Sequence, residues 1–222
     1  NGTPSYANPG GGGATAYSTS SASASMAITG VNDAPVLATG STLAYTENQA
    51  ATAINTAITV ADVDSTTLAS ATVQINGNYS SAEDVLAFTN VGMGNIAGVW
   101  NSGTGTMTLT SAGATATLAQ WQAALRAVTY ANSSDNPSTA ARTVSYAAND
   151  GALASNTVTS TVNITAVNDV PTLANLAGDA LAYAEGDGAV VIEQGTNATV
   201  ADVDSANFDA GTLTVSFTAG SD

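Results

Sequence analysis

The sequence predicts an all-β protein made of tandem β-sandwich repeats, with one short helix in each repeat. Short segments rich in Val, Ile and Thr alternate with turn residues along most of the chain, which is typical of β-sandwiches. The pentapeptide Val-Asn-Asp-x-Pro begins at Val31 and again at Val167, and the same Ala-Asp-Val-Asp-Ser follows each copy, at Ala61 and at Ala201. The copies are therefore about 140 residues apart, which is the size of one domain.

This repeat divides the chain into three expected parts. Residues 31–166 hold one complete sandwich. Residues 1–30 are rich in Gly, Ser and Ala, but their alternation matches the end of the complete repeat, so we expect the last two strands of a preceding repeat there. Residues 167–222 match its first strands and begin a following, incomplete repeat, which is too small to bury a sandwich core alone. The chain is therefore expected to be a segment of a longer protein.

Strand boundaries follow from the apolar alternation and from the turn residues between the segments. In the complete repeat the expected strands are 43–46, 53–60, 68–75, 84–89, 96–100, 106–110, 128–130, 142–148 and 155–165. The fifth and sixth flank Asn-Ser-Gly-Thr-Gly, a hairpin turn. Val85, Leu86 and Phe88 are all expected to pack in the fourth. The following repeat is expected to form strands at 181–184, 189–200 and 212–217.

One stretch has helical rather than strand periodicity. Leu118, Trp121 and Leu125 are spaced to share one face of a helix. Thr117 precedes them as an N-cap, and Gln120 follows three residues later as its capping-box partner. We therefore expect a short helix that packs on the sandwich, with Trp121 in the core rather than on a binding surface.

Acidic residues dominate the charge of this chain. Seventeen Asp and Glu face two basic residues, Arg126 and Arg142, which gives a net charge of −15 at pH 7. Clustered Lys or Arg are needed to neutralise phosphates, so a nucleic-acid partner is excluded. The acidic excess has two interpretations: solubility through self-repulsion, or neutralisation of specific Asp clusters by bound cations.

Missing residue types narrow the function further. The chain has no His and no Cys, so it has neither Ser-His-Asp nor Cys-His machinery and no zinc site of the usual composition. We therefore do not expect an enzyme. The sequence has no run of about 18 apolar residues, so no membrane span is expected in this segment.

Sandwich topology brings one group of polar residues to the end at which the chain enters. In an Ig-like sandwich the B–C and F–G loops share the end where strand A begins. Asp62 and Asp64 follow the second expected strand, and Asp150 precedes the last one, so both loops are expected beside Asn32 and Asp33. One amide and four carboxylates suit Ca²⁺, which prefers hard oxygen ligands, better than Mg²⁺, which keeps its own waters.

A second calcium site is expected at the opposite end. Glu47 follows the first strand, close to the point where Asn168 and Asp169 lead into the next repeat, whose Asp-x-Asp is Asp202 and Asp204. The ligands of this site would come from both repeats. An ion held there would fix the angle between them.

Each of these assignments has a simpler alternative. Asp62, Asp64 and Asp150 are also of the residue type that caps turns, and the Asn-Asp-Gly around Asp150 is a good β-turn sequence. Asp84 and Asp135 are expected in turns at the end opposite the chain entry. Either residue would add a ligand to the second site or be an ordinary turn residue.

These motifs resemble those of a known family. Val-Asn-Asp-Ala-Pro at a domain start, a Glu at the first strand and Asp-x-Asp about thirty residues after the linker resemble the calcium-linker motifs of cadherin repeats. Their order and spacing, with the Leu-Ala-Gln-Trp-Gln-Ala-Ala-Leu-Arg segment, are most similar to the cadherin-like repeats of giant bacterial surface adhesins. These are RTX-type proteins exported by type I secretion.

The resemblance implies Ig-like sandwiches in a row, stiffened by Ca²⁺ at their linkers, that hold a distal adhesive module away from the cell. It implies linker ligands at Asn32, Asp33, Asn168 and Asp169, Asp-x-Asp ligands at Asp62, Asp64, Asp202 and Asp204, and a first-strand ligand at Glu47. The Leu-Asp-Arg-Glu segment of animal cadherins is absent, which leaves the number of ions at each junction open.

The expected function is therefore that of an extracellular, calcium-binding stalk segment of a cell-surface adhesin. Its expected partners are neighbouring repeats or identical protomers in a fibre, with cell-surface or glycan ligands reached through other modules. One alternative is a filament subunit, in which strands of one protomer complete the open sandwich of the next.

Another alternative is a carbohydrate-binding or enzymatic module. Trp100, Tyr79 and Tyr130 are the candidate sugar platforms, but aromatic residues make up only 5% of the chain. Glu83 and Asp84 are the candidate acid pair. Adjacent residues of a strand point to opposite faces, so these two carboxyls do not form a catalytic dyad.

Overall fold

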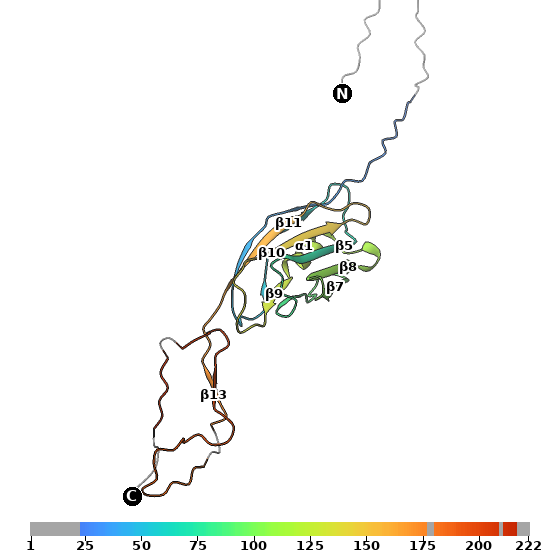
Figure 1. Cartoon of the computed structure of the whole chain (residues 1–222). Helices are drawn as coiled ribbons and strands as arrows, with labels where there is room; N and C mark the ends of the chain where they lie inside the picture. Colours follow the sequence, from blue (N-terminus) through green and yellow to red (C-terminus); the bar gives the residue numbers. More distant parts are fainter. Residues whose placement is uncertain (1–22, 177–179, 209–210, 217–222) are drawn as a thin grey trace, which may run out of the picture. The chain divides into compact units, whose positions relative to one another are not determined.

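Strands make up most of the regular structure in the described residues. A computed structural model describes residues 23–176, 180–208 and 211–216, and Figure 1 shows their course. By its contacts the chain divides into two units, 1–31 and 32–222. In the described part the second unit is all-β with one α-helix, which confirms the predicted fold class. The strands expected before residue 31 fall mostly on residues 1–22, outside the described residues, and 23–30 contain no strand.

A six-stranded sheet forms the larger layer of the sandwich. Its strands lie in the order β2, β11, β10, β5, β8, β7 (Figure 1). In that order their bounds are Thr42–Thr46, Val158–Thr165, Arg142–Asn149, Ser70–Gly77, Thr106–Ser111 and Ile96–Asn101. β2 runs parallel to β11, and the other neighbours are antiparallel. β7 and β8 form the expected hairpin.

Shorter strands complete the sandwich. β3 (Thr52–Ala53), β9 (Thr129–Asn132) and β6 (Asp84–Ala87) form a three-stranded antiparallel sheet. β1 (Val36–Ala38) pairs with β4 (Thr59–Ala61) in a separate two-stranded sheet. One continuous core of buried side chains draws on all of these sheets.

The single strand expected at 53–60 is wrong, because Asn55 interrupts it. The Asn55 side-chain oxygen accepts hydrogen bonds from the N–H groups of Ala57 and Ile58, at 3.0 and 2.9 Å. Its amide group donates to the carbonyl of Thr39 at 2.8 Å. Local bonds of this kind compete with the strand ladder. The segment therefore splits into β3, which pairs with β9, and β4, which pairs with β1.

The predicted helix is confirmed with its cap. α1 spans Leu118–Arg126, the Thr117 hydroxyl accepts from the Gln120 N–H at 3.3 Å, and the Thr117 N–H donates to Gln120 Oε1 at 2.9 Å. Trp121 is fully buried as expected, and its ring N–H donates to the carbonyl of Leu68 at 3.0 Å. No helix in the described ranges has the length and apolar character that a membrane span requires.

β6 buries a carboxylate in place of one of the apolar residues expected there. Asp84 and Leu86 face the core, each 1% exposed, whereas Val85 faces outward and is 42% exposed. The expectation that Val85 packs is therefore wrong, while Leu86 and the partly buried Phe88 do pack. Successive side chains of a strand alternate between faces, so the buried Asp84 decides which of them lie inside.

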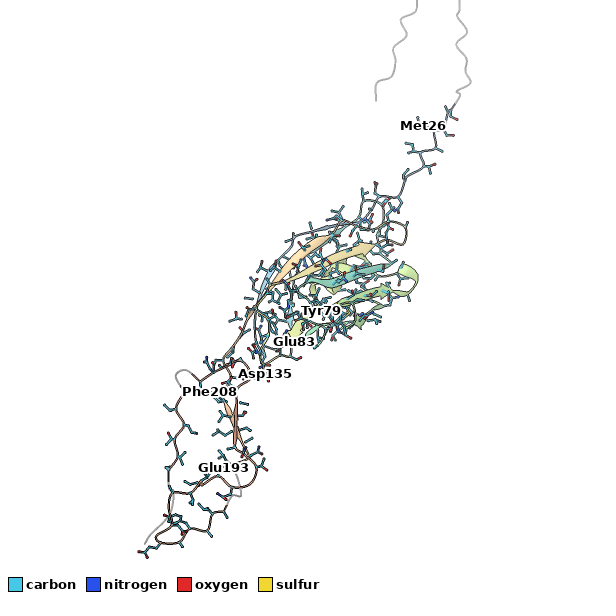
Figure 2. All side chains as sticks on the ribbon, viewed as in Figure 1. Met26, Tyr79, Glu83, Asp135, Glu193 and Phe208 are labelled. Atoms are coloured by element: carbon cyan, nitrogen blue, oxygen red, sulfur yellow. The ribbon has the colours of Figure 1, made fainter. Side chains whose placement is uncertain are left out.

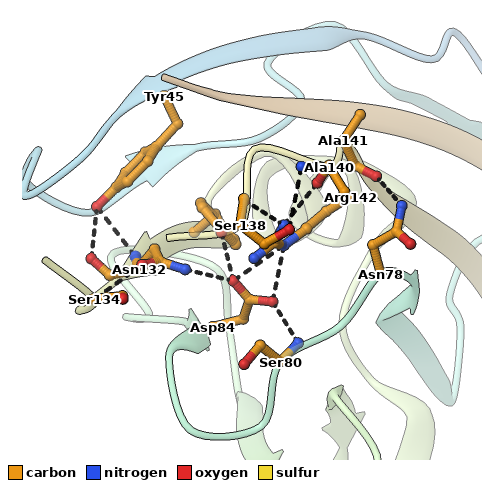
Figure 3. A network of polar contacts seen from close by, with 11 residues as sticks. Tyr45, Asn78, Ser80, Asp84, Asn132, Ser134, Ser138, Ala140, Ala141 and Arg142 are labelled. Atoms are coloured by element: carbon orange, nitrogen blue, oxygen red, sulfur yellow. Dashed lines mark hydrogen bonds and ion pairs between the residues drawn. The ribbon is translucent and has the colours of Figure 1, made fainter. Parts of the chain in front are cut away.

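A buried ion pair joins β6 to β10 across the core. Arg142 Nε lies 3.1 Å from Asp84 Oδ2, and neither side chain has any exposed surface. The Asp84 carboxylate also accepts hydrogen bonds from the Tyr130 hydroxyl at 2.6 Å, the Asn132 amide group at 2.8 Å and the Ser80 N–H at 2.8 Å (Figure 3). The Arg142 guanidinium donates to two backbone carbonyls of the preceding turn. Sheet packing thus depends on a polar network as well as on apolar burial.

The segment after Val167 repeats the start of the sandwich. β12 (Thr172–Ala174) pairs with β13 (Thr199–Ala201) in an antiparallel ladder. The register is that of β1 and β4, in which Val36 lies opposite Ala61. The repeated motifs of the sequence thus coincide with a repeated piece of structure.

Further strands expected in this segment do not form. Residues 181–184 and 211–216 contain no strand, and within 189–200 only the start of β13 does; residue 217 lies outside the described residues. In the complete repeat, β2 and β5 are stabilised by pairing with β11, β10 and β8. The described residues 181–184 and 211–216 pair with no strand of this kind.

Asp84→Ala is expected to lower the free energy of unfolding by about 3–5 kcal/mol, because it leaves the Arg142 charge buried without a partner. Urea unfolding followed by tryptophan fluorescence measures this loss. The double change Asp84→Leu with Arg142→Met is expected to recover only part of it: it removes the unpaired charge, but it leaves the donors of Tyr130, Asn132 and Ser80 without an acceptor. A single-variant loss below about 1 kcal/mol would contradict the buried pair, since that is the range of exposed ion pairs.

Candidate metal centres

The first polar cluster gathers at the end of the sandwich where β1 begins. Asn32 and Asp33 precede β1, Asp62 and Asp64 lie between β4 and β5, and Asp150 lies between β10 and β11. The Asn32 amide group donates to Asp150 Oδ2 at 2.8 Å, and the Asp33 N–H donates to Asp64 Oδ2 at 3.0 Å. The structure therefore brings together the three segments that the topology predicted.

Turn capping accounts for part of this first cluster. Asp62 Oδ1 accepts from the N–H groups of Asp64 and Ser65, at 3.2 and 2.9 Å. The hydrogen bond from Asn32, followed by those from two backbone N–H groups, lowers the pKa of the Asp150 carboxyl. The second oxygen of Asp62, Oδ2, is buried and has no hydrogen-bond partner. This oxygen is free for a ligand that turn capping alone does not require.

A second cluster meets the geometric requirement for a metal ion more closely. Carboxylate oxygens of Glu47, Asp135 and Asp169 all lie within 4.8 Å of one another, and no other acidic group of this kind occurs in the described residues. Glu47 follows β2, Asp135 lies between β9 and β10, and Asp169 follows β11. Glu47 is only 6% exposed. We call these three residues the carboxylate triad; their spacing allows them to hold a metal ion.

Hydrogen bonds hold the sandwich side of the triad in place. The Val167 N–H donates to Glu47 Oε2 at 2.7 Å, and the Asn48 amide group donates to Asp135 Oδ1 at 3.0 Å. The Glu47 N–H donates to the carbonyl of Thr165 at 2.9 Å. The turn after β2 is therefore tied both to the end of β11 and to the loop that carries Asp135 (labelled in Figure 2).

The segment after the sandwich supplies the other side of the triad. The Asp169 N–H donates to Asp204 Oδ2 at 3.1 Å, and the Asn136 amide group donates to the carbonyl of Val203 at 2.9 Å. Asp169 Oδ2 is buried and has no hydrogen-bond partner. One carboxylate oxygen of the triad residues is thus left without a donor.

Charge accumulates at the triad. Partial desolvation raises the pKa of the Asp169 carboxyl, and the neighbouring charges of Asp135, Glu47, Asp204 and Asp202 raise it further. Each of these groups favours protonation of Asp169 because like charges repel. A divalent cation at the same place would remove this repulsion.

The two clusters are built alike. The contact from the Asp33 N–H to Asp64 Oδ2, at 3.0 Å, recurs between Asp169 and Asp204 at 3.1 Å. In both copies the first Asp of Asp-x-Asp accepts from the N–H of the second, at 3.2 and 3.3 Å. In both copies the linker Asn donates to the carbonyl of the Asp next to it in the chain. The repeated sequence motif therefore corresponds to a repeated hydrogen-bond pattern.

Of the residues predicted for the second site, Glu47 and Asp169 lie in the triad. Asp204 accepts the hydrogen bond from the Asp169 N–H, and Asn168, Asp202 and Asp204 stay predicted ligands. Asp135, which the sequence left open between ligand and turn residue, also lies in the triad. The sequence signal for Asp135 as a ligand was its expected position in a loop at the same end of the sandwich as Glu47. The other open residue, Asp84, is buried against Arg142 and does not belong to the triad.

The three aromatic residues considered as sugar platforms pack against other parts of the protein. Tyr130 is fully buried. Tyr79 and Trp100 pack edge to face with ring centroids 6.2 Å apart, and the Tyr79 hydroxyl donates to the carbonyl of Ser102 at 2.5 Å. Both residues of that pair are partly buried against the core.

Comparison of the sequence with protein-family models and with curated proteins finds no match. The functional assignment therefore depends on the two clusters and on the charge of the chain.

Proposed function

We propose that this chain is a segment of an extracellular, calcium-stiffened stalk, in which Ca²⁺ bound at the junctions between sandwich repeats sets their relative orientation. The observation that carries the proposal is the carboxylate triad. Two of its members, Glu47 and Asp135, belong to loops of the sandwich, and the third, Asp169, belongs to the linker after β11. An ion bound to all three would join the sandwich to the next segment of the chain.

The protein itself offers no counter-charge for these carboxylates. Its two basic residues are Arg126 and Arg142. Arg142 pairs with Asp84, and the Arg126 guanidinium donates to the backbone carbonyls of Ile58 and Ala57. A bound cation is the simplest way to balance the triad at neutral pH.

Calcium fits the donor set best. Only oxygen ligands are present, as carboxylates and amide or backbone carbonyls, and Ca²⁺ takes six to eight such ligands in flexible geometry. Mg²⁺ demands a near-ideal octahedron and usually retains several waters. The unpartnered Oδ2 atoms of Asp62 and Asp169 are candidate ligand atoms at the first and second cluster.

The motif resemblance to cadherin-like repeats of bacterial RTX-type adhesins supplies the biological setting. On this proposal the chain acts outside the cell, at its surface, as a structural element of adhesion rather than as an enzyme. Asn32, Asp33, Asp62, Asp64 and Asp150 would hold calcium at the first junction. Asn168, Asp202 and Asp204 would support the triad at the second.

Calcium is expected to raise the melting temperature of the chain. At free Ca²⁺ a hundredfold above Kd, one site contributes about 2.7 kcal/mol, which corresponds to roughly 5–10 °C for a protein of this size. Calorimetry in Ca²⁺ and in EGTA measures the difference. Equal melting temperatures in the two buffers would contradict calcium binding.

The matched variants are Glu47→Gln with Asp169→Asn, which remove two charges of the triad, and Glu83→Gln, which removes one acid outside it. The triad variant is expected to lose the part of the calcium-dependent shift that the triad contributes and to keep the part from the first junction, because neutral amides are weaker ligands than carboxylates. The Glu83 variant is expected to keep the whole shift. If both variants kept it, the ion would be bound elsewhere.

Stiffening is tested separately by small-angle X-ray scattering of the full chain. Without Ca²⁺, repulsion among the triad carboxylates is expected to loosen the linker after β11 and broaden the range of conformations. Addition of Ca²⁺ is expected to narrow it in the native chain but not in Asp169→Asn. Identical scattering with Ca²⁺ and with EGTA would leave calcium binding intact but contradict the stalk function.

Exposed apolar side chains after Val167 favour a second candidate, the strand-complemented filament. Leu181, Val190 and Ile192 are between 37% and 63% exposed and line an open cavity of about 480 Å³. Strands from an identical protomer would cover them. Sedimentation velocity over a range of concentrations tests this candidate: growth of long oligomers supports it, and a monomer throughout contradicts it.

A further inference from the structure

We infer that a buried hydrogen-bond network centred on Tyr45 and Asn132 positions the two sandwich loops that carry Glu47 and Asp135, and so prepares the carboxylate triad for its ion. The inference rests on the proposed function, since it concerns the affinity of the same site. Tyr45 and Asn132 are positioning residues and not ligands: neither belongs to the triad.

The Tyr45 hydroxyl connects the two loops directly. It donates to the carbonyl of Gln49 at 2.5 Å, in the turn that contains Glu47, and accepts from the N–H of Asn132 at 3.1 Å, at the end of β9. Tyr45 is 1% exposed, and its ring packs edge to face on Tyr130 with centroids 5.0 Å apart. Because the hydroxyl is buried, its loss would leave the Asn132 N–H without a partner.

The Asn132 side chain extends this connection into the loop of Asp135. Its Oδ1 accepts from the Ser134 N–H at 3.0 Å, and its Nδ2 donates to Asp84 Oδ1 at 2.8 Å (Figure 3). Asp84 is in turn fixed by the buried Arg142. The loop that presents Asp135 is thus anchored through one side chain to the most deeply buried charges of the sandwich.

Gln49 closes the turn that contains Glu47. The Gln49 N–H donates to the carbonyl of Thr46 at 2.9 Å, and the Gln49 side chain accepts from the Thr46 N–H at 3.0 Å. Tyr45 caps this closed turn from the core through the carbonyl of Gln49. At the surface, Asn48 then spans to Asp135. Two connections, one buried and one exposed, therefore hold the loops at a fixed separation.

Such anchoring matters because carboxylates gathered without an ion repel one another. Loops free to move would separate and would have to be brought back when the ion binds, which reduces affinity. Residues that hold metal ligands typically change affinity by about 10–100-fold when they are removed. The network offsets the repulsion before the ion arrives.

The test uses Tyr45→Phe in the full chain, monitored residue by residue by amide NMR during titration with CaCl₂. This change keeps the buried ring and removes only the hydroxyl. The Val167 N–H, which donates to Glu47, reports on the triad, and the Ser65 N–H, which donates to Asp62, reports on the first cluster. The apparent Kd at Val167 is expected to rise about tenfold, while that at Ser65 stays unchanged.

Tyr146→Phe is the matched control, because it removes the same hydroxyl from another fully buried tyrosine, on β10 and outside the network. It is expected to leave both Kd values unchanged. A second readout needs no metal: in EGTA, the N–H groups of Asn132 and Ser134 are expected to exchange with solvent faster in Tyr45→Phe than in Tyr146→Phe.

The outcomes separate the inference from the proposed function. No calcium response at Val167 in the native chain would overturn both. A normal native response with an unchanged Kd in Tyr45→Phe would overturn the inference alone. Equal weakening at Val167 and Ser65 would also overturn it, since that pattern indicates general destabilisation rather than positioning of one site.

Discussion

The rest of this structure depends on one constraint. Negative charge is concentrated at the ends of a sandwich that has almost no positive charge. The chain carries a net charge of −15 and two arginines. One arginine is used inside the core and the other binds backbone carbonyls. Glu47, Asp135 and Asp169 nevertheless converge within 4.8 Å. An arrangement that repels itself and has no protein counter-charge is most simply understood as one completed by a cation.

The sandwich holds this arrangement together through hydrogen bonds from donors that carry no charge. Glu47 accepts a hydrogen bond from the Val167 N–H, and Asp204 accepts one from the Asp169 N–H. Asp135 accepts one from the amide group of Asn48. Behind them, Tyr45 and Asn132 link the loops to the buried pair of Asp84 and Arg142. The core polar network and the surface cluster are therefore connected by hydrogen bonds.

Signals within a few residues of one another predicted the fold well. The capping box of Thr117 and Gln120 and the spacing of Leu118, Trp121 and Leu125 predicted α1, because helix formation is decided locally. The break at Asn55 was missed, because its carbonyl partner on Thr39 and the different strands that pair with β3 and β4 lie outside the local sequence. The orientation of Val85 was missed because the partner of Asp84, Arg142, lies on a distant strand.

For the candidate sites as well, the sequence predicted some contacts and missed those that depend on distant loops. The repeated motif and Ig-like topology predicted that Asn32 and Asp33 would meet Asp64 and Asp150. The hydrogen bonds from Asn32 to Asp150 and from Asp33 to Asp64 agree. Membership of the triad depends on how loops from β2, β9 and β11 converge, which no local pattern encodes. For that reason Asp135 was left open between ligand and turn residue, although it lies in the triad.

The most direct test of the central claim is a crystal structure of the full chain grown with saturating Ca²⁺. We expect a calcium ion between Glu47, Asp135 and Asp169, with oxygen ligands at about 2.3–2.6 Å and about six to eight ligands in all. Water alone between these three carboxylates, at saturating Ca²⁺ and with the triad otherwise intact, would contradict it.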